Sequence, residues 1–195
     1  YDGVMRSIEA SQKRLGIDQF DILHIHDPDY FIEEALDGAY KALDELRRQG
    51  IIRAVGCGAN HWEVLLQLAR RADFDCFLLA GRYTLLDQSA MAELLPLCQE
   101  KGIAIINAGI YNSGILAHPD PASINETRSD ANSIPTWKDN ITYNYIPAPQ
   151  FIIQKAAAIK AVCDRHKVPL MAAAIQFSLH HQAVVAVLMG PRSPE

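Results

Sequence analysis

The sequence lacks the features that mark membrane proteins and disulfide-bonded secreted domains. No apolar run approaches the ~20 residues that a membrane-spanning helix needs, and no signal-peptide pattern opens the chain. Cysteine is scarce, and none of the four cysteines belongs to a C-x-x-C pair. Three of them stand in apolar surroundings, which predicts reduced thiols in or near the core of a cytoplasmic protein. The four are Cys57, Cys76, Cys98 and Cys163.

Basic charge is also in short supply. The chain has 18 Lys and Arg residues against 23 Asp and Glu residues, a formal net charge of −5. The basic residues are scattered, and no basic stripe interleaves with aromatic side chains, which argues against a nucleic-acid partner. Walker and G-x-S-x-G patterns are absent, and Gly56-x-Gly58-x-x-His61 lacks the third glycine of the dinucleotide-binding fingerprint. We therefore expect none of these motif-defined functions.

What the chain does have is a regular alternation of helical and strand patterns. Its 195 residues, 49% of them hydrophobic, are enough for a single domain with a substantial core. Apolar residues at helical spacing predict helices, and short apolar runs predict strands. Helices are expected at 3–15, 33–49, 61–71, 89–101, 151–166 and 170–181, and strands at 20–26, 51–57, 74–80, 103–108 and 183–188. Asn60 stands where it is expected to cap the helix that starts at His61.

This alternation predicts an α/β fold with a parallel sheet. Five strands that are polar at their C-terminal ends are typical of part of a (β/α)8 TIM barrel, which takes about 250 residues. A flavodoxin-like sheet also needs only five strands. The opening helix and the two consecutive helices near the end make it the weaker alternative. Because the chain starts at Tyr1 and Ser193-Pro194-Glu195 is a helix-start signal at its very end, we expect a piece of a longer protein.

Residues 117–149 interrupt the alternation. This segment holds five prolines and many polar residues, and it is too long for an ordinary connection. We expect a long mobile loop that serves a functional site.

The polar ends of the expected strands are the candidate functional residues. The apolar run at 20–25 stops at His26 and Asp27, and the next strand stops at Gly58 and Asn60. Two later strands end in glycine-containing turns, at 109–114 and at 190–193. Glycines let a phosphate approach the main chain closely, and helix starts favour anions. The strand ends therefore predict a site for a phosphorylated cofactor beside a polarising histidine.

His24-x-His26 leaves one rival open, because metal-dependent hydrolases place such a pair at a strand end. That chemistry needs further His and Asp ligands at the later strand ends. Those ends carry Asn60, Arg82, Asn112 and Arg192. We therefore treat a metal-dependent hydrolase as a minor alternative and expect no metal.

Several segments resemble the aldo-keto reductase superfamily, and within it bacterial dehydrogenases of aldoses and of pyridoxal. They are SIEASQKRLGIDQFDILHIHDPD, GAYKALDELRRQGIIRAVGCGANHWE, DCFLLAGRYTLLDQSA, NAGIYNSGILA and VLMGPRSPE. In order, they look like the third crossover helix and strands four to eight of that family's barrel. The resemblance covers essentially the whole chain.

The resemblance implies a role for each matching residue. His26 matches the histidine that polarises the substrate oxygen, and Asn60 matches the amide that holds the nicotinamide carboxamide. The turn that wraps the pyrophosphate matches Gly109, Asn112, Ser113 and Gly114, after Ala108 at the strand end. The segment that starts the adenosine-phosphate site matches Gly190, Pro191 and Arg192. Asp27 and Trp62 are expected to contact the substrate.

The implied activity is hydride transfer between NADP or NAD and C1 of an aldose or another aldehyde. Two positions depart from the family pattern: Ala80 stands where many members have Gln, and Ala108 where many stack a Tyr on the nicotinamide. The family's general acid/base Tyr, with its Lys and Asp, lies on elements before the first helix of this chain. The alternative is therefore a non-catalytic barrel fragment, and the oligomeric state stays open.

Overall fold

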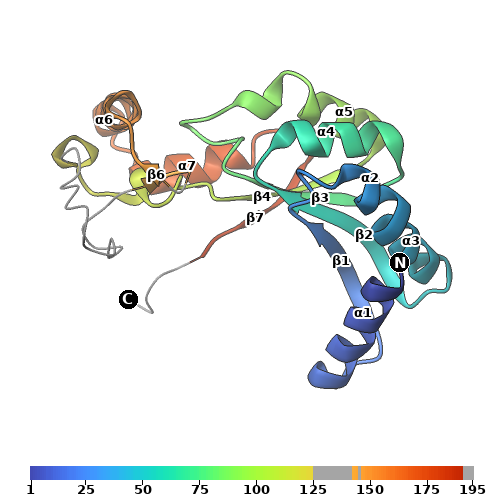
Figure 1. Cartoon of the computed structure of the whole chain (residues 1–195). Helices are drawn as coiled ribbons and strands as arrows, with labels where there is room; N and C mark the ends of the chain where they lie inside the picture. The colour runs from blue at the N-terminus through green and yellow to red at the C-terminus, as the bar shows by residue number, and fades with distance from the viewer. Residues whose placement is uncertain (125–141, 145, 191–195) are drawn as a thin grey trace.

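Five parallel strands form one twisted sheet whose order follows the chain (Figure 1). The computed structural model describes residues 1–124, 142–144 and 146–190. The order in the sheet is β1-β2-β3-β4-β7. The strands are β1 (Phe20–His26), β2 (Ile52–Ala59), β3 (Cys76–Ala80), β4 (Ala104–Ala108) and β7 (Val184–Leu188). A flavodoxin-like sheet would reverse its strand order once, so this sheet is an arc of a (β/α)8 barrel, as the sequence predicts.

The helices lie before β1 and in the connections between successive strands. They are α1 (Asp2–Leu15), α2 (Ile32–Glu34), α3 (Lys41–Arg48), α4 (Trp62–Arg71), α5 (Leu94–Lys101), α6 (Gln150–Arg165) and α7 (Leu170–Ser178). A π-helical turn, η1 (Ala35–Tyr40), joins α2 to α3. The 3-10 turns are η2 (Ser89–Met91), η3 (Ile115–Ala117) and η4 (Pro121–Ser123). Among the described residues, none of the helices has the length and apolar character needed to cross a bilayer.

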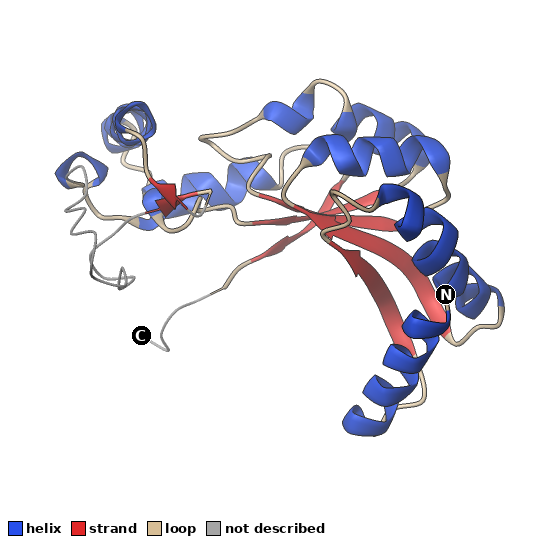
Figure 2. Ribbon diagram, in the orientation of Figure 1, coloured by secondary structure: helices blue, strands red, loops and turns tan. Residues whose placement is uncertain are grey.

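Alternate side chains of the strands point to opposite faces of the sheet. Leu23 and Ile25 of β1 are partly buried and pack against the main core cluster, which contains Val55 and Cys57 of β2. The helices contribute Leu43, Leu65, Leu68, Leu94 and Leu95 to this cluster. Figure 2 shows α3, α4 and α5 together on this side of the sheet. His24 and His26 have the opposite parity to Leu23 and Ile25 and therefore face the opposite side of the sheet.

A second core cluster lies away from the sheet. It joins α6 and α7 to η3 and to the loop after β3, with Leu86, Ile115, Leu116, Ile152, Ile153 and Ala174 among its buried members. Lys155 of α6 adds a hydrogen bond from its Nζ to the Leu86 carbonyl at 2.8 Å. This cluster holds the α6–α7 pair at the β4–β7 end of the sheet (Figure 1).

Two sequence predictions are corrected at helix starts. The helix expected from Ser89 begins only at Leu94, after the 3-10 turn η2, because Pro96 has no N–H and fits an α-helix only in its first turn. Asn60 does not cap α4: His61 occupies the cap position, and no side chain makes a capping bond there.

The long segment 117–149 contains regular structure. It includes η4 and the short antiparallel pair β5 (Thr142–Tyr143) and β6 (Ile146–Pro147). Residues 125–141 and 145 of the predicted mobile loop lie outside the described residues. The β5–β6 hairpin returns the chain to the sheet, as described below.

Candidate active site

The predicted site residues come together because the strands are parallel and in register. His26 is paired with Gly58, Ala59 with Leu79, and Ala80 with Ala108. Ala108 is in turn paired with Leu188 of β7. All five strands therefore end at one edge of the sheet, where barrel enzymes place their active sites.

His26 is the last residue of β1, and its side chain is 86% exposed. Its Nε2 lies 3.5 Å from Asp27 Oδ2. Asp27 has a φ of 45°, a conformation that few residues other than glycine adopt, while its N–H donates to the Gly58 carbonyl at 2.9 Å. This turn leads the chain out of the sheet immediately after His26 and leaves the imidazole open at the edge.

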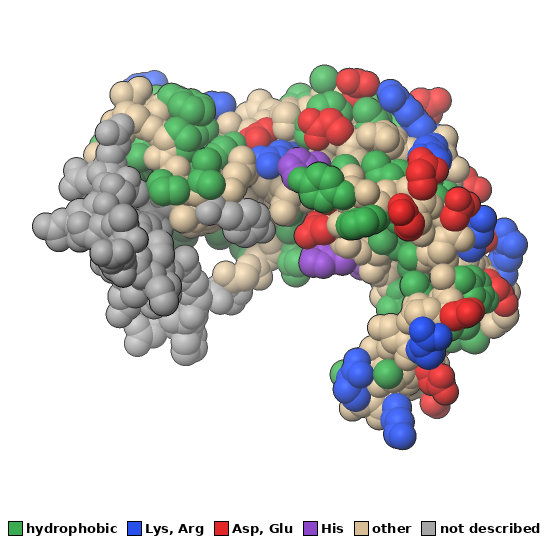
Figure 3. Space-filling view, viewed as in Figure 1, with side chains coloured by type: hydrophobic (Ala, Val, Ile, Leu, Met, Phe, Trp, Pro, Cys, Tyr) green, Lys and Arg blue, Asp and Glu red, His purple; other side chains and the backbone are tan. Residues whose placement is uncertain are grey.

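The loop that follows His26 is fastened to the start of α4. The Asp29 carboxylate, only 15% exposed, contacts Nδ1 of His61, the residue at the α4 cap position. No sequence motif links these two residues, so the pair cannot be predicted from the sequence. In the space-filling view, two histidine patches with acidic side chains beside them lie near the middle of the visible face (Figure 3).

Asn60 follows the last residue of β2 and so lies at the same edge as His26. Its backbone carbonyl accepts a hydrogen bond from Arg82 Nε at 2.9 Å. The next residue but one, Trp62, begins α4 and is partly buried against the main core. The predicted roles of Asn60 on the nicotinamide and of Trp62 and Asp27 on the substrate stay predictions.

The turn after β4 has an unusual backbone. Gly109, Asn112, Ser113 and Gly114 have φ values of 63°, 46°, 59° and 97°. The Asn112 N–H donates to the Gly109 carbonyl at 2.9 Å, and its side-chain Nδ2 donates to the Gly81 carbonyl at 3.4 Å. The Gly114 N–H also donates within the turn, to the Tyr111 carbonyl at 3.1 Å, so an anion would be held by the remaining N–H groups of the turn.

A groove of 390 Å³ runs between this turn and the end of β7. Its lining includes Gly109, Tyr111, Ser113, Gly114 and Gly190. The Tyr111 hydroxyl lies 3.7 Å from the sulfur of Met189, so the turn after β4 contacts the residue that follows β7. Pro191 and Arg192, the other predicted contacts of the adenosine phosphate, lie outside the described residues.

These residues fit the nucleotide portion of NAD or NADP. The left-handed turn offers main-chain N–H groups to a pyrophosphate, and a Cβ added to Gly114 or Gly190 would meet no atom within 4 Å. Asn112 is buried, and its Oδ1 has no hydrogen-bond partner in the parts of the chain that the structure describes. A buried unpaired acceptor calls for a donor from a ligand or water. Ala108 ends the strand that leads into this turn.

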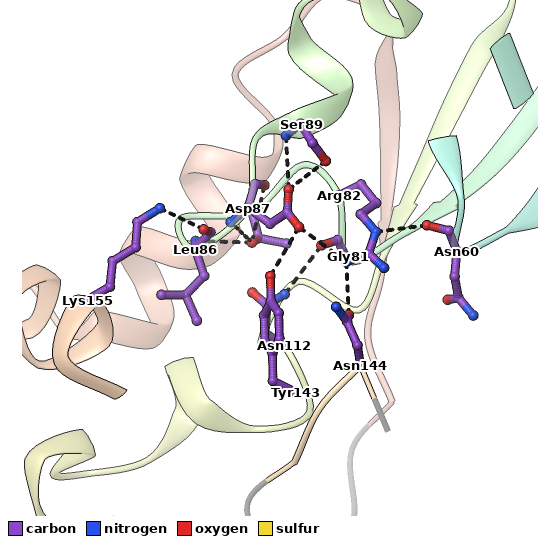
Figure 4. A network of polar contacts seen from close by, with 11 residues as sticks. Asn60, Gly81, Arg82, Leu86, Asp87, Ser89, Asn112, Tyr143, Asn144 and Lys155 are labelled. Carbon is purple, nitrogen blue, oxygen red and sulfur yellow. Dashed lines mark hydrogen bonds and ion pairs between the residues drawn. The ribbon is translucent and has the colours of Figure 1, made fainter. Parts of the chain in front are cut away.

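A network of polar contacts, not foreseen from the sequence, surrounds Arg82 (Figure 4). Besides Asn60, the Arg82 guanidinium contacts Asp87 and Asn144, each through Nη1, at 3.2 and 2.9 Å. Tyr143 donates its hydroxyl hydrogen to Asp87 Oδ2 at 3.1 Å. Arg82 thereby joins the ends of β2 and β3 to the β5–β6 hairpin. Tyr83, the residue that follows Arg82, is buried in the main core.

His24 lies one layer below His26. Burial lowers the pKa of His24, opposed by the backbone of Cys57, so the imidazole is held in its neutral form. Within the described ranges, no three His, Cys, Asp or Glu side chains are grouped so that they could hold a metal ion. His24 is therefore best explained as a packing residue of the sheet face.

The whole chain, residues 1–195, matches the family described as the aldo/keto reductase family. Pyridoxal 4-dehydrogenase from Microbacterium luteolum is 42% identical to it over 205 residues, and D-threo-aldose 1-dehydrogenase from Pseudomonas sp is 38% identical over 193 residues. These alignments cover 100% and 98% of this chain but 55% and 54% of the two relatives. The chain thus spans about half the length of the curated relatives it matches.

Solved structures show the same fold. The glycerol dehydrogenase from Gluconobacter oxydans superposes with a TM-score of 0.70 at 22% identity, over 98% of this chain and 55% of that one. An aldo-keto reductase from Bacillus halodurans, in its holo form, gives 0.69 at 22% identity, over 97% and 57%. With a family match that reaches from the first residue to the last, the chain belongs to the aldo/keto reductase family.

Proposed function

We propose that the protein containing this chain is an NAD(P)-dependent oxidoreductase that transfers a hydride to or from C1 of an aldose or another aldehyde. The observation that carries the proposal is the arrangement of one sheet edge. His26 and Asn60 end neighbouring strands, and the phosphate-type turn 109–114 ends a third strand of the same sheet. The names of the two relatives, a pyridoxal and an aldose dehydrogenase, support the substrate class.

The chain's own residues have defined tasks in this proposal. The nicotinamide ring, when bound, supplies or accepts the hydride. His26 donates a hydrogen bond to the substrate oxygen and so stabilises the negative charge that develops there. Asn60 orients the nicotinamide through its amide, and the turn from Gly109 to Gly114 holds the pyrophosphate with main-chain N–H groups.

The test is a spectrophotometric assay of the full-length protein with NAD⁺ and NADP⁺ in turn. L-fucose, other D-threo-aldoses and pyridoxal are the oxidation substrates, and simple aldehydes are tested with the reduced cofactors. Turnover with one of these pairs supports the proposal. Cofactor binding without turnover on any of the substrates contradicts it.

A second candidate concerns the 195-residue chain taken alone: a non-catalytic barrel segment. It is favoured by the open sheet, in which Ile22 of β1 and Leu188 of β7 are 41% and 53% exposed. Exposed strand edges and apolar faces promote self-association. Sedimentation of the isolated chain tests this candidate: self-association without turnover supports it, and hydride transfer at enzymatic rates overturns it.

We propose the cytoplasm as the location. All four cysteines are buried free thiols. Burial raises the pKa of Cys57 and of Cys98 to about 12, so both stay protonated and inert. Unpaired buried thiols are typical of proteins that fold in reducing compartments.

A further inference from the structure

We propose that Arg82 is a positioning residue that fixes the β5–β6 hairpin against the Asn60 side of the active site, and that the hairpin helps to select the substrate. This inference rests on the proposed function, because it assigns residues that shape the same site. Arg82 itself is not expected to touch the reacting atoms.

The guanidinium of Arg82 joins three separate segments of the chain. Arg82 Nε donates to the Asn60 carbonyl at 2.9 Å, Nη1 to Asn144 Oδ1 at 2.9 Å, and Nη1 also to Asp87 Oδ2 at 3.2 Å. The arginine and aspartate side chains are only 14% and 17% exposed. A charge this well buried is retained only if it is fully paired, so these contacts hold the segments in one arrangement.

Both oxygens of the Asp87 carboxylate, the partner of Arg82, accept hydrogen bonds from other residues. Asp87 Oδ1 accepts hydrogen bonds from the Ser89 N–H at 2.9 Å and the Ser89 hydroxyl at 2.7 Å. Asp87 Oδ2 accepts from the Tyr143 hydroxyl at 3.1 Å. Burial acts to raise the pKa of Asp87, but these bonds and the Arg82 charge lower it overall, so the carboxylate stays ionised.

Tyr143 is held in the matching protonation state. Burial, together with the charge of Asp87, raises the pKa of its phenol to about 12. The hydroxyl therefore remains a hydrogen-bond donor across the physiological range. The hairpin is tied down at two adjacent positions, by the Tyr143 hydroxyl to Asp87 and by the Asn144 amide oxygen to Arg82.

Arg82 also lies next to the candidate site. Figure 4 shows Arg82 between Asn60 on one side and Asn144 on the other, with Tyr143 beside Asp87. Asn60 is the predicted nicotinamide contact, so the hairpin approaches the site at the cofactor's reactive end. Because planar guanidinium N–H groups point in fixed directions, Arg82 sets the position of the hairpin relative to Asn60, and thereby the space left for the substrate.

The experiment uses the full-length protein and compares variants at three positions. Asn144 has a φ of 52°, so Asn144→Gly and Asn144→Asp both tolerate its backbone, but only aspartate keeps an oxygen for Arg82. Tyr143→Phe removes only the bond to Asp87. Arg82→Lys keeps the charge and loses the planar geometry. Arg70→Ala is the control, because it breaks an exposed ion pair between Arg70 of α4 and Glu93 at the start of α5, with side chains 58% and 53% exposed.

Four quantities are measured: amide hydrogen exchange of residues 142–144 and 146, the Kd for NAD(P)⁺ by fluorescence titration, and kcat and KM for the substrate. We expect Asn144→Gly and Tyr143→Phe each to speed hairpin exchange and to raise KM by about tenfold, the effect of losing one hydrogen bond to a charged group. The cofactor Kd stays unchanged in both. Asn144→Asp keeps the wild-type exchange rate, KM and cofactor Kd, whereas Arg82→Lys raises both KM and the cofactor Kd.

Unchanged amide exchange of the hairpin in Arg82→Lys would overturn the positioning role of Arg82, whatever the values of kcat and KM. Faster exchange with an unchanged KM in Asn144→Gly and Tyr143→Phe would overturn the substrate-selecting role. Wild-type protein that binds NAD(P)⁺ but turns over no carbonyl or sugar would instead contradict the proposed function, and the exchange measurement would still report on Arg82 alone.

Discussion

The imidazole of His24 occupies the space directly above Gly56, its register partner in the neighbouring strand. A Cβ added to Gly56 would lie 2.5 Å from His24 Nδ1 and 3.0 Å from Cys76 Sγ. A glycine in the middle of a strand normally weakens it. Because Gly56 has no side chain, the His24 imidazole can pack directly against its backbone. The two residues lie one layer below the edge of the sheet that carries the candidate site.

Gly56→Ala should lower the free energy of unfolding by about 1–3 kcal/mol, the usual effect of forcing an extra carbon into a packed site. Urea unfolding of the full-length protein measures this. The matched control is Gly58→Ala in the same strand, where the new Cβ would lie 3.6 Å from the Leu78 Cβ, an ordinary contact. Equal stability of the two variants would show that His24 moves aside freely.

The burial of His24 also makes the free energy of unfolding depend on pH. The pKa of His24 is lowered in the folded state, so the unfolded chain binds the proton first, and stability is lost as pH falls from the unfolded value of about 6.5 towards the folded one. Burial and the charge of His180 lower the pKa of His181 in the same direction. Burial and Asp75 raise the pKa of Cys76 to about 11, so this neighbour does not titrate there.

We therefore expect His24→Gln to flatten, but not abolish, the fall in unfolding free energy between about pH 7 and pH 5. His181 accounts for the remaining slope. Urea titrations at several pH values in that range measure the slope of unfolding free energy against pH. An identical slope in wild type and variant would contradict the lowered pKa of the buried His24.

The turn after β4 allows a prediction about cofactor binding. Gly114 has a φ of 97° and open space where a Cβ would be. Gly114→Ala should cost about 1–2 kcal/mol of stability through its backbone alone, and it should also weaken NAD(P)⁺ binding several-fold because the new methyl group enters the groove.

Gly16→Ala is the matched control for that variant. Gly16 has a φ of 68°, has equally open surroundings, and ends α1. It should show a similar loss of stability with an unchanged Kd. Isothermal titration with NAD⁺ and NADP⁺ separates the two effects, and an unchanged Kd in Gly114→Ala would remove this turn from the cofactor site.

The sequence was a good guide to whatever depends on local periodicity. The apolar run of β1 predicts that His24 and His26 point to the same face of the sheet. The strand ends lie at one edge because parallel strands run in the same direction. It failed where the answer depends on contacts between distant segments. Asn60 does not cap α4, because β2 continues to Ala59 and His61 takes the cap position.

Two contacts near the candidate site cannot be predicted from the sequence pattern. Asp29 and His61 are 32 residues apart, and Arg82 and Asn144 are 62 residues apart. Such pairs form only after the sheet has brought the loops together, so neither spacing nor composition predicts them. The glycines of the turn at 109–114 predict a phosphate site, and that role stays a prediction. The positive φ values at Asn112 and Ser113 are not predictable, because neither residue type usually adopts them.

The most direct test of the proposed function is the kinetics of His26→Ala in the full-length protein, with His166→Ala, an exposed histidine that follows α6, as the control. A histidine that polarises the substrate oxygen contributes a factor of about 10²–10⁴ to turnover. We expect His26→Ala to lower kcat by at least ~10²-fold with the NAD(P)⁺ Kd preserved, and His166→Ala to match the wild type. A His26→Ala variant with wild-type kcat would contradict the assignment.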